Sequence, residues 1–126
     1  MNWLRVDELL KDCQKWGAAG SVPASVPTAY AKVLERYNGV EGFVGPEQYL
    51  MLWRAEQIEE LNIGYSVAEY LPGVVLIGTD GADTGFGVDT GGAYVSVPLV
   101  GMSPKETKSV GASFDAFLEH LASGEG

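Results

Sequence analysis

Apolar side chains recur every three or four residues in several segments of this chain, which is the spacing of one face of an α-helix. The longer segments are bounded by Gly, Pro, Asn-Gly or Ser, the residues that favour helix ends. The pattern predicts helices at 3–16 before Gly17, at 27–37 from Pro27 to Asn38-Gly39, at 55–62, and at 113–121 with Ser113 as N-cap.

Shorter apolar runs predict β-strands in the middle of the chain. Residues 49–53 are large and apolar but too few for a helix, which indicates a strand covered on both faces. Residues 74–77 are mostly β-branched and predict a central strand. Apolar positions alternate with small or polar ones in 86–89, which indicates a half-exposed strand. A further strand covers 95–99, where Pro98 marks its end or a sheet edge.

The connections between these elements are rich in glycine and turn-forming residues. They are 17–27, 42–45, 63–72, 79–84 and 90–92. Within the third of them a helical turn is expected near 68–70. Consecutive strands joined by short turns favour an antiparallel sheet flanked by helices, so we expect one α+β domain over 1–126 with a frayed tail at 123–126.

Net charge narrows the classes of partner. The 126 residues include 17 acidic and 8 basic side chains, which gives a net charge of −9. Phosphate backbones and anionic membranes attract clustered Lys and Arg, so this balance argues against nucleic acid and membrane surfaces and favours a basic protein partner. The first residues lack the apolar run of a signal peptide, which predicts a cytoplasmic protein.

The acids are concentrated in a segment without cations. From Ala55 to Pro104 the chain has no Lys or Arg. The acids of this segment are Glu56, Glu59, Glu60, Glu69, Asp80, Asp83 and Asp89. Two interpretations stay open, a solvated surface and a face that binds a partner.

Several glycine-rich motifs suggest chemistry but also fit turns. Asp83-Thr84-Gly85 and Asp89-Thr90-Gly91 are triplets of the aspartic-protease type, whose two carboxylates share a proton. The aspartates here, Asp80 included, offer oxygen ligands for Ca²⁺, although their spacing is not that of an EF-hand. Gly85-x-Gly87 lacks the Lys-Ser/Thr of a phosphate-binding loop. Turn formation explains all three motifs, so we expect no metal and no cofactor.

The single cysteine and single histidine exclude an internal disulfide and most metal clusters of these residues. Cys13 lies on an apolar helical face, as a buried structural thiol does. His120 lies outside the apolar stripe of the last helix and has no orienting partner, so we predict no catalytic residue there. Trp3, Trp16 and Trp53 lie on apolar stripes and are expected to pack in the core.

Five pieces of the chain form a recognisable series. They are Tyr30 with Leu34-Glu35-Arg36-Tyr37-Asn38-Gly39; Leu52-Trp53 followed by Glu56, Ile58 and Asn62; Val75-Leu76-Ile77-Gly78-Thr79-Asp80-Gly81; Gly87-Val88-Asp89; and Phe114-x-x-Phe117-Leu118. In order and spacing this series, which spans residues 20–122, resembles the SMI1/KNR4 family, also called SUKH.

This resemblance implies binding rather than catalysis. Many bacterial members look like immunity proteins that neutralise a toxin, often a nuclease, and fungal members resemble regulatory scaffolds. An acidic protein can cover the basic surface with which a nuclease holds phosphates. The expected partner-binding residues are Glu56, Glu59 and Glu60 in one ridge and Asp80, Asp83 and Asp89 in another, with Arg54 as their only nearby cation.

Two other functions stay open. One is a regulatory scaffold or interaction domain without a toxin partner. The other is an aspartyl hydrolase that forms its carboxylate pair across a homodimer, from Asp83 or Asp89. The pattern predicts no oligomeric state.

Overall fold

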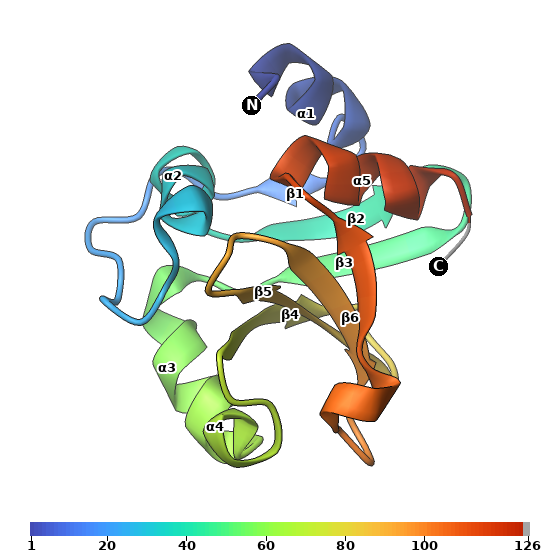
Figure 1. Ribbon diagram of the computed structural model, residues 1–126. Helices are drawn as coiled ribbons and strands as arrows, with labels where there is room; N and C mark the ends of the chain where they lie inside the picture. Colours follow the sequence, from blue (N-terminus) through green and yellow to red (C-terminus); the bar gives the residue numbers. More distant parts are fainter. Residues whose placement is uncertain (125–126) are drawn as a thin grey trace.

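One antiparallel sheet runs through the computed structural model, which describes residues 1–124 (Figure 1). Its strands lie side by side in chain order, so each pairs with the strands before and after it. They are β1 (Gln14–Lys15), β2 (Val40–Val44), β3 (Gln48–Leu52), β4 (Val74–Thr79), β5 (Thr84–Asp89), β6 (Tyr94–Pro98) and β7 (Lys108–Gly111). The antiparallel sheet is as predicted, and the β-branched run lies in its central strand.

Helices pack at separate places around this sheet (Figure 1). One pair, α1 (Trp3–Leu9) and α5 (Phe114–Ala122), is in mutual contact, and α5 also contacts β2 and β7. A second pair, α3 (Ala55–Gly64) and α4 (Val67–Tyr70), contacts β4. The remaining helical elements are α2 (Thr28–Arg36) and the 3₁₀ turn η1 (Pro104–Glu106). The α+β class is confirmed. None of the helices within residues 1–124 has both the length and the apolar character needed to cross a bilayer.

Aromatic side chains fill the core between α5 and the sheet. Phe117 meets the edge of Phe86 on β5 and stacks on Tyr94 of β6, in both cases with ring centroids 5.3 Å apart. Phe114 meets Tyr30 of α2 at 6.1 Å, and all five rings are buried. The apolar stripe of the last helix is therefore in the core as predicted. Of the tryptophans, Trp53 is buried, and Trp3 and Trp16 are half-buried.

Strand β5 is buried on both faces, which corrects the expectation of a half-exposed strand. Phe86 packs on α5, and the glycines of the opposite face are covered by neighbouring side chains. A Cβ on Gly87 would lie 2.7 Å from Cγ1 of Val74, and one on Gly85 would lie 2.7 Å from Cδ2 of Leu99. The alternation was misleading because a glycine leaves space that a neighbouring aliphatic side chain can fill.

The first helix is shorter than its apolar spacing predicts. It ends at Leu9, and after a turn the chain pairs with β2 as the short strand β1. The ammonium group of Lys15 donates to the carbonyls of Leu10 and Cys13 at 2.8 and 3.1 Å, which stabilises the turn. Cys13 is nevertheless buried, because it lies against Gly42, where a Cβ would be 2.8 Å from the Cys13 Cα. The apolar spacing thus reflects the burial of Cys13 correctly, but it does not show that this residue lies outside the helix.

Sequence patterns also miss two strands and misjudge the burial of a third. Strand β2 occupies most of the segment expected to be a turn-bounded piece, because glycine interrupts its apolar pattern. Strand β7 exposes its polar side chains and buries only Val110. In β3, Leu50 and Leu52 are buried whereas Tyr49 and Met51 are half-buried. One face of β3 therefore lies in the core, not both.

Several predicted ends and turns are confirmed. The hydroxyl of Ser113 accepts a hydrogen bond from the N–H of Ala116 and caps α5. Pro98 is the last residue of β6, and the predicted helical turn near 68–70 is α4. The predicted frayed tail falls partly on Glu125 and Gly126, which lie outside the described residues.

Candidate functional site

Three of the predicted acids form a ridge along α3. Glu56, Glu59 and Glu60 are three and four residues apart, which places them on one side of the helix, and all three are exposed. The amide nitrogen Nδ2 of Asn38 donates to Glu56 at 2.9 Å and holds the pKa of that carboxyl below its usual range. The amide oxygen of Asn38 accepts from the N–H of Ala55 at 2.7 Å. Asn38 therefore ties the end of α2 to the start of this ridge.

The other three predicted acids do not form a second ridge. Asp80 and Asp83 lie in the turn between β4 and β5, whereas Asp89 ends β5 at its opposite end. A strand of this length separates the two turns by about 17–20 Å. The expectation of one ridge from these aspartates is therefore wrong. For the same reason Asp83 and Asp89 of one chain cannot share a proton as protease carboxylates do.

Asp80 and Asp89 have the same structural role. Oδ1 of Asp80 accepts hydrogen bonds from the backbone N–H groups two and four residues further on, at 2.8 and 3.1 Å. Oδ1 of Asp89 accepts from the N–H groups at the same two offsets, at 2.9 and 3.0 Å. Each carboxylate thus closes its own turn, as the turn interpretation predicts. Asp83 is the exposed member of the three.

Beside α3, the sheet splits. Strand β3 pairs with β4 through Met51 with Thr79 and through the pair next to it. After one more bond, from the N–H of Trp53 to the carbonyl of Ile77 at 2.9 Å, the chain turns away into α3. Where β3 has left the edge of β4, Asn62 of α3 makes the hydrogen bonds that a neighbouring strand would make. Its Nδ2 donates to the carbonyl of Leu76 and its Oδ1 accepts from the Leu76 N–H, both at 2.9 Å. This amide pair joins the helix to β4 and leaves the start of β4 beside an open space.

That space is a groove of about 500 Å³ between α3, α4 and the start of β4. Ile63, in the last turn of α3, is 78% exposed, although it is a large aliphatic residue. Val74 and Val75 line the groove from β4, and Glu59 and Glu69 line it from the helices. The remaining lining residues are Ser25, Asn62, Ser66 and Ala68. An exposed apolar surface beside carboxylates is a typical feature of a binding site.

The groove combines one predicted site residue with several that sequence patterns miss. Of the six predicted acids, Glu59 is in its lining. Val74 and Val75 belong to a run that predicts a central strand. That pattern does not show that the space beside the start of β4 is open. Ile63 was the available signal, because it lies off the helical stripe formed by Ile58 and Leu61.

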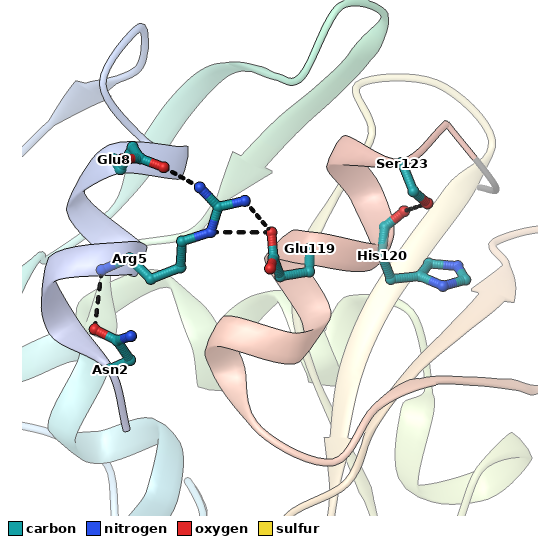
Figure 2. Close-up of polar contacts among 6 residues, drawn as sticks. All are labelled: Asn2, Arg5, Glu8, Glu119, His120 and Ser123. Atoms are coloured by element: carbon teal, nitrogen blue, oxygen red, sulfur yellow. Dashed lines mark hydrogen bonds and ion pairs between the residues drawn. The ribbon is translucent and has the colours of Figure 1, made fainter.

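Within residues 1–124, no basic side chain forms an ion pair with the six predicted acids or with Glu69. The ion pairs there are Arg5 with Glu8, Arg5 with Glu119 and Arg36 with Asp7. Figure 2 shows Arg5 reaching from α1 to Glu119 on α5. Arg54, the cation expected near the acids, lies over the ring of Trp16, 4.9 Å from its centroid, and its charge adds to the hydrogen bond from Asn38 in lowering the pKa of Glu56. The ion pairs in the described part of the chain are therefore formed by α1, α2 and α5.

Cys13 and His120, the residue types that could serve as a nucleophile and a base, lie in surroundings that do not favour catalysis. Cys13 is buried, its thiol donates to the carbonyl of Phe43 at 3.4 Å, and burial raises its pKa, whereas a nucleophile needs the thiolate. His120 is half-buried on α5, and its carbonyl accepts from the hydroxyl of Ser123 (Figure 2). Across residues 1–124, no three His, Cys, Asp or Glu side chains gather as ligands for a metal ion.

A scan against protein-family models finds no match for this chain, and a search of the curated proteins finds none either. The resemblance to SMI1/KNR4 therefore depends on the sequence motifs alone.

Proposed function

We propose that this protein is a non-enzymatic binding module, an immunity protein that neutralises a basic toxin domain by covering its active surface. One observation carries the proposal. Glu59 and Glu69 line an exposed apolar groove, the exposed Glu60 follows Glu59 on α3, and none of the three has an ion-pair partner within residues 1–124. The resemblance to the SMI1/KNR4 family supports the same function.

Electrostatics explain why this surface suits a nuclease. A protein that binds phosphates presents Lys and Arg around its active site. A chain with a net charge of −9 attracts such a surface over a distance and speeds the encounter. In the complex, apolar contact in the groove excludes water while the acids pair at its rim. Occupying the phosphate-binding surface then inhibits the toxin without any bond being made or broken.

Binding assays against a panel of purified basic nuclease toxin domains test the proposal. We expect a complex whose affinity falls as ionic strength rises from about 0.01 M to 0.15 M, because the screening length falls from roughly 30 Å to 8 Å. The double variant Glu59→Lys/Glu60→Lys should bind about tenfold or more weakly at the lower salt, with a flatter salt dependence. Isothermal titration calorimetry measures both, and rescue of growth on co-expression measures neutralisation.

The matched control carries the same charge change elsewhere. Glu35 on α2 and Glu106 in η1 are exposed acids outside the groove, so Glu35→Lys/Glu106→Lys should bind almost as tightly as the unmodified protein. An equal loss in both double variants would mean that net charge alone acts, and no loss in either would reject the α3 site. A neutral host protein captured at every salt concentration, with no toxin complex, would favour the regulatory scaffold instead.

A further inference from the structure

The groove offers apolar contact and negative charge but little free backbone. Ile63 protrudes at one side, Val74 and Val75 form the β4 side, and Glu59 and Glu69 supply the carboxylates. A partner segment that fits this chemistry needs apolar side chains to enter the groove and cations beside them. The secondary structure of that segment follows from the hydrogen bonds of β4.

A bound β-strand would need the free backbone edge of β4. That edge is already occupied where β3 leaves it, because Asn62 pairs with both the N–H and the carbonyl of Leu76 at 2.9 Å. Two residues earlier, the N–H of Val74 donates to the carbonyl of Leu71 at 3.1 Å. Strand addition obtains its affinity from such backbone groups. Their occupation disfavours this mode of binding at the groove.

We infer that the groove receives one amphipathic helix of the protein partner, with apolar residues at i, i+3, i+4 and i+7 and Lys or Arg on its flanks. A helix satisfies its own backbone and binds through side chains, which is what this groove can accept. Charge complementarity predicts the cationic flanks of that helix, because the groove is lined by Glu59 and Glu69 and by no cation among residues 1–124. The inference rests on the proposed function, since it names the element of the basic partner that the same site binds.

A synthetic peptide of about 14 residues, roughly four helical turns, tests the inference. It carries Leu at the helical spacing and Lys on the flanks, and a scrambled peptide of identical composition is the comparison. In ¹H–¹⁵N NMR spectra of the full chain, the patterned peptide should shift the amides of Ile63, Ser66 and Val75. The scrambled peptide should bind about tenfold more weakly, because only ordered apolar residues enter the groove together.

Two exposed apolar residues give a matched pair of variants. Ile63→Ser should weaken binding of the patterned peptide about tenfold, because the side chain contacts the inserted face. Leu4→Ser should leave binding unchanged, because Leu4 is 85% exposed on α1, outside the groove. Since both side chains are largely exposed, neither substitution should prevent folding, and unchanged NMR dispersion verifies this.

Several results would overturn the inference without touching the proposed function. Equal binding of the patterned and scrambled peptides would show attraction by charge alone. Amide shifts on the outer face of β2 and β3 would place the peptide elsewhere, and no binding of either peptide at about 1 mM would deny the groove this ligand. The proposed function fails separately, when the unmodified protein forms no complex with a basic toxin domain even at low ionic strength.

Discussion

Within residues 1–124, the ion pairs of this protein lie on the side of α1, α2 and α5, and the α3–α4 side has none. Arg5 bridges Glu8 and Glu119 across two helices that are far apart in the sequence. Glu59 and Glu60 are equally exposed, yet no basic side chain within residues 1–124 forms an ion pair with them. Both sides expose acids to water, so exposure alone does not explain the difference.

The difference indicates that the unpaired acids of α3 lower the stability of the isolated chain. Exposed ion pairs contribute little each, but adjacent acids on one helix repel one another. An unpaired acidic surface is thus a small cost to the isolated fold and an attraction for a cationic partner. The charges of α1 and α5 therefore serve the isolated fold, whereas α3 and α4 combine a structural inner face with an acidic outer face that suits a partner.

Asn62 belongs to the structural part of α3, and its replacement should have the largest effect. Asn62→Asp keeps the acceptor for the Leu76 N–H but loses the donor to the carbonyls of Ile58 and Leu76, and it places a negative charge against both. We expect the free energy of unfolding to fall by about 2–3 kcal/mol. Urea denaturation near neutral pH measures it.

Asn2→Asp is the matched control for this change. Asn2 caps α1 by accepting from the N–H of Arg5 at 3.1 Å, and aspartate caps a helix as well as asparagine does (Figure 2). The stability of Asn2→Asp should therefore be unchanged or slightly higher. An Asn62→Asp variant as stable as this control would mean that the amide does not join α3 to β4.

The two kinds of helix surface differ in how far the sequence predicts them. The inner stripes of α2, α3 and α5 follow from apolar spacing, because burial of one face sets that period. The strands β1 and β7 escape prediction because they are short and polar, and β2 because Gly42 interrupts its apolar pattern. Local patterns thus predict the elements whose own side chains form the core.

The candidate site likewise has a part that the sequence predicts and a part that it does not. The spacing of Glu59 and Glu60 predicts the exposed ridge, because it depends on one helix alone. The groove depends on where β3 leaves β4 and on the bond from Asn62 to Leu76, which are 14 residues apart. The role of Asp80 in its turn was open to prediction, since an Asp-Gly pair favours turns. Its separation from Asp89 also follows from the strand predicted over 86–89, which lies between the two turns.

The paired side should respond to acid in a defined direction. The bonds from Arg36 and Tyr37 hold the pKa of Asp7 below its ordinary value of 3.8. A lowered pKa in the folded state stabilises the protein above the unfolded-state pKa, and this contribution is lost as the pH falls through the folded-state pKa. Asp7→Asn should therefore lower Tm near neutral pH by about 1–4 °C, since the ion pair is exposed.

The same argument fixes the outcome in acid. As the pH falls through the folded-state pKa of Asp7, the difference in Tm between the variant and the unmodified protein should shrink toward zero. Asp83→Asn is the control, because Asp83 is exposed and forms none of the ion pairs, so its Tm near neutral pH should stay within about 1 °C. A loss on Asp7→Asn that persists in acid would assign the effect to the hydrogen bond with Tyr37 instead of the charge.

The smallest expected effect is the change in Tm when one exposed glutamate is neutralised. It contrasts α3 and α5 most directly, because Tm should rise for one helix and fall for the other. Glu60→Gln removes a carboxylate four residues from Glu56, so the like-charge repulsion along α3 falls and Tm should rise by about 1 °C. Glu119→Gln removes the acid that Arg5 contacts at 2.5 Å, and Tm should fall. Calorimetric scans at low ionic strength resolve both, and high salt should remove both because it screens exposed charges. Falls of equal size would mean that Glu60 stabilises the isolated chain, and the case for an acid kept for a partner would lose its physical basis.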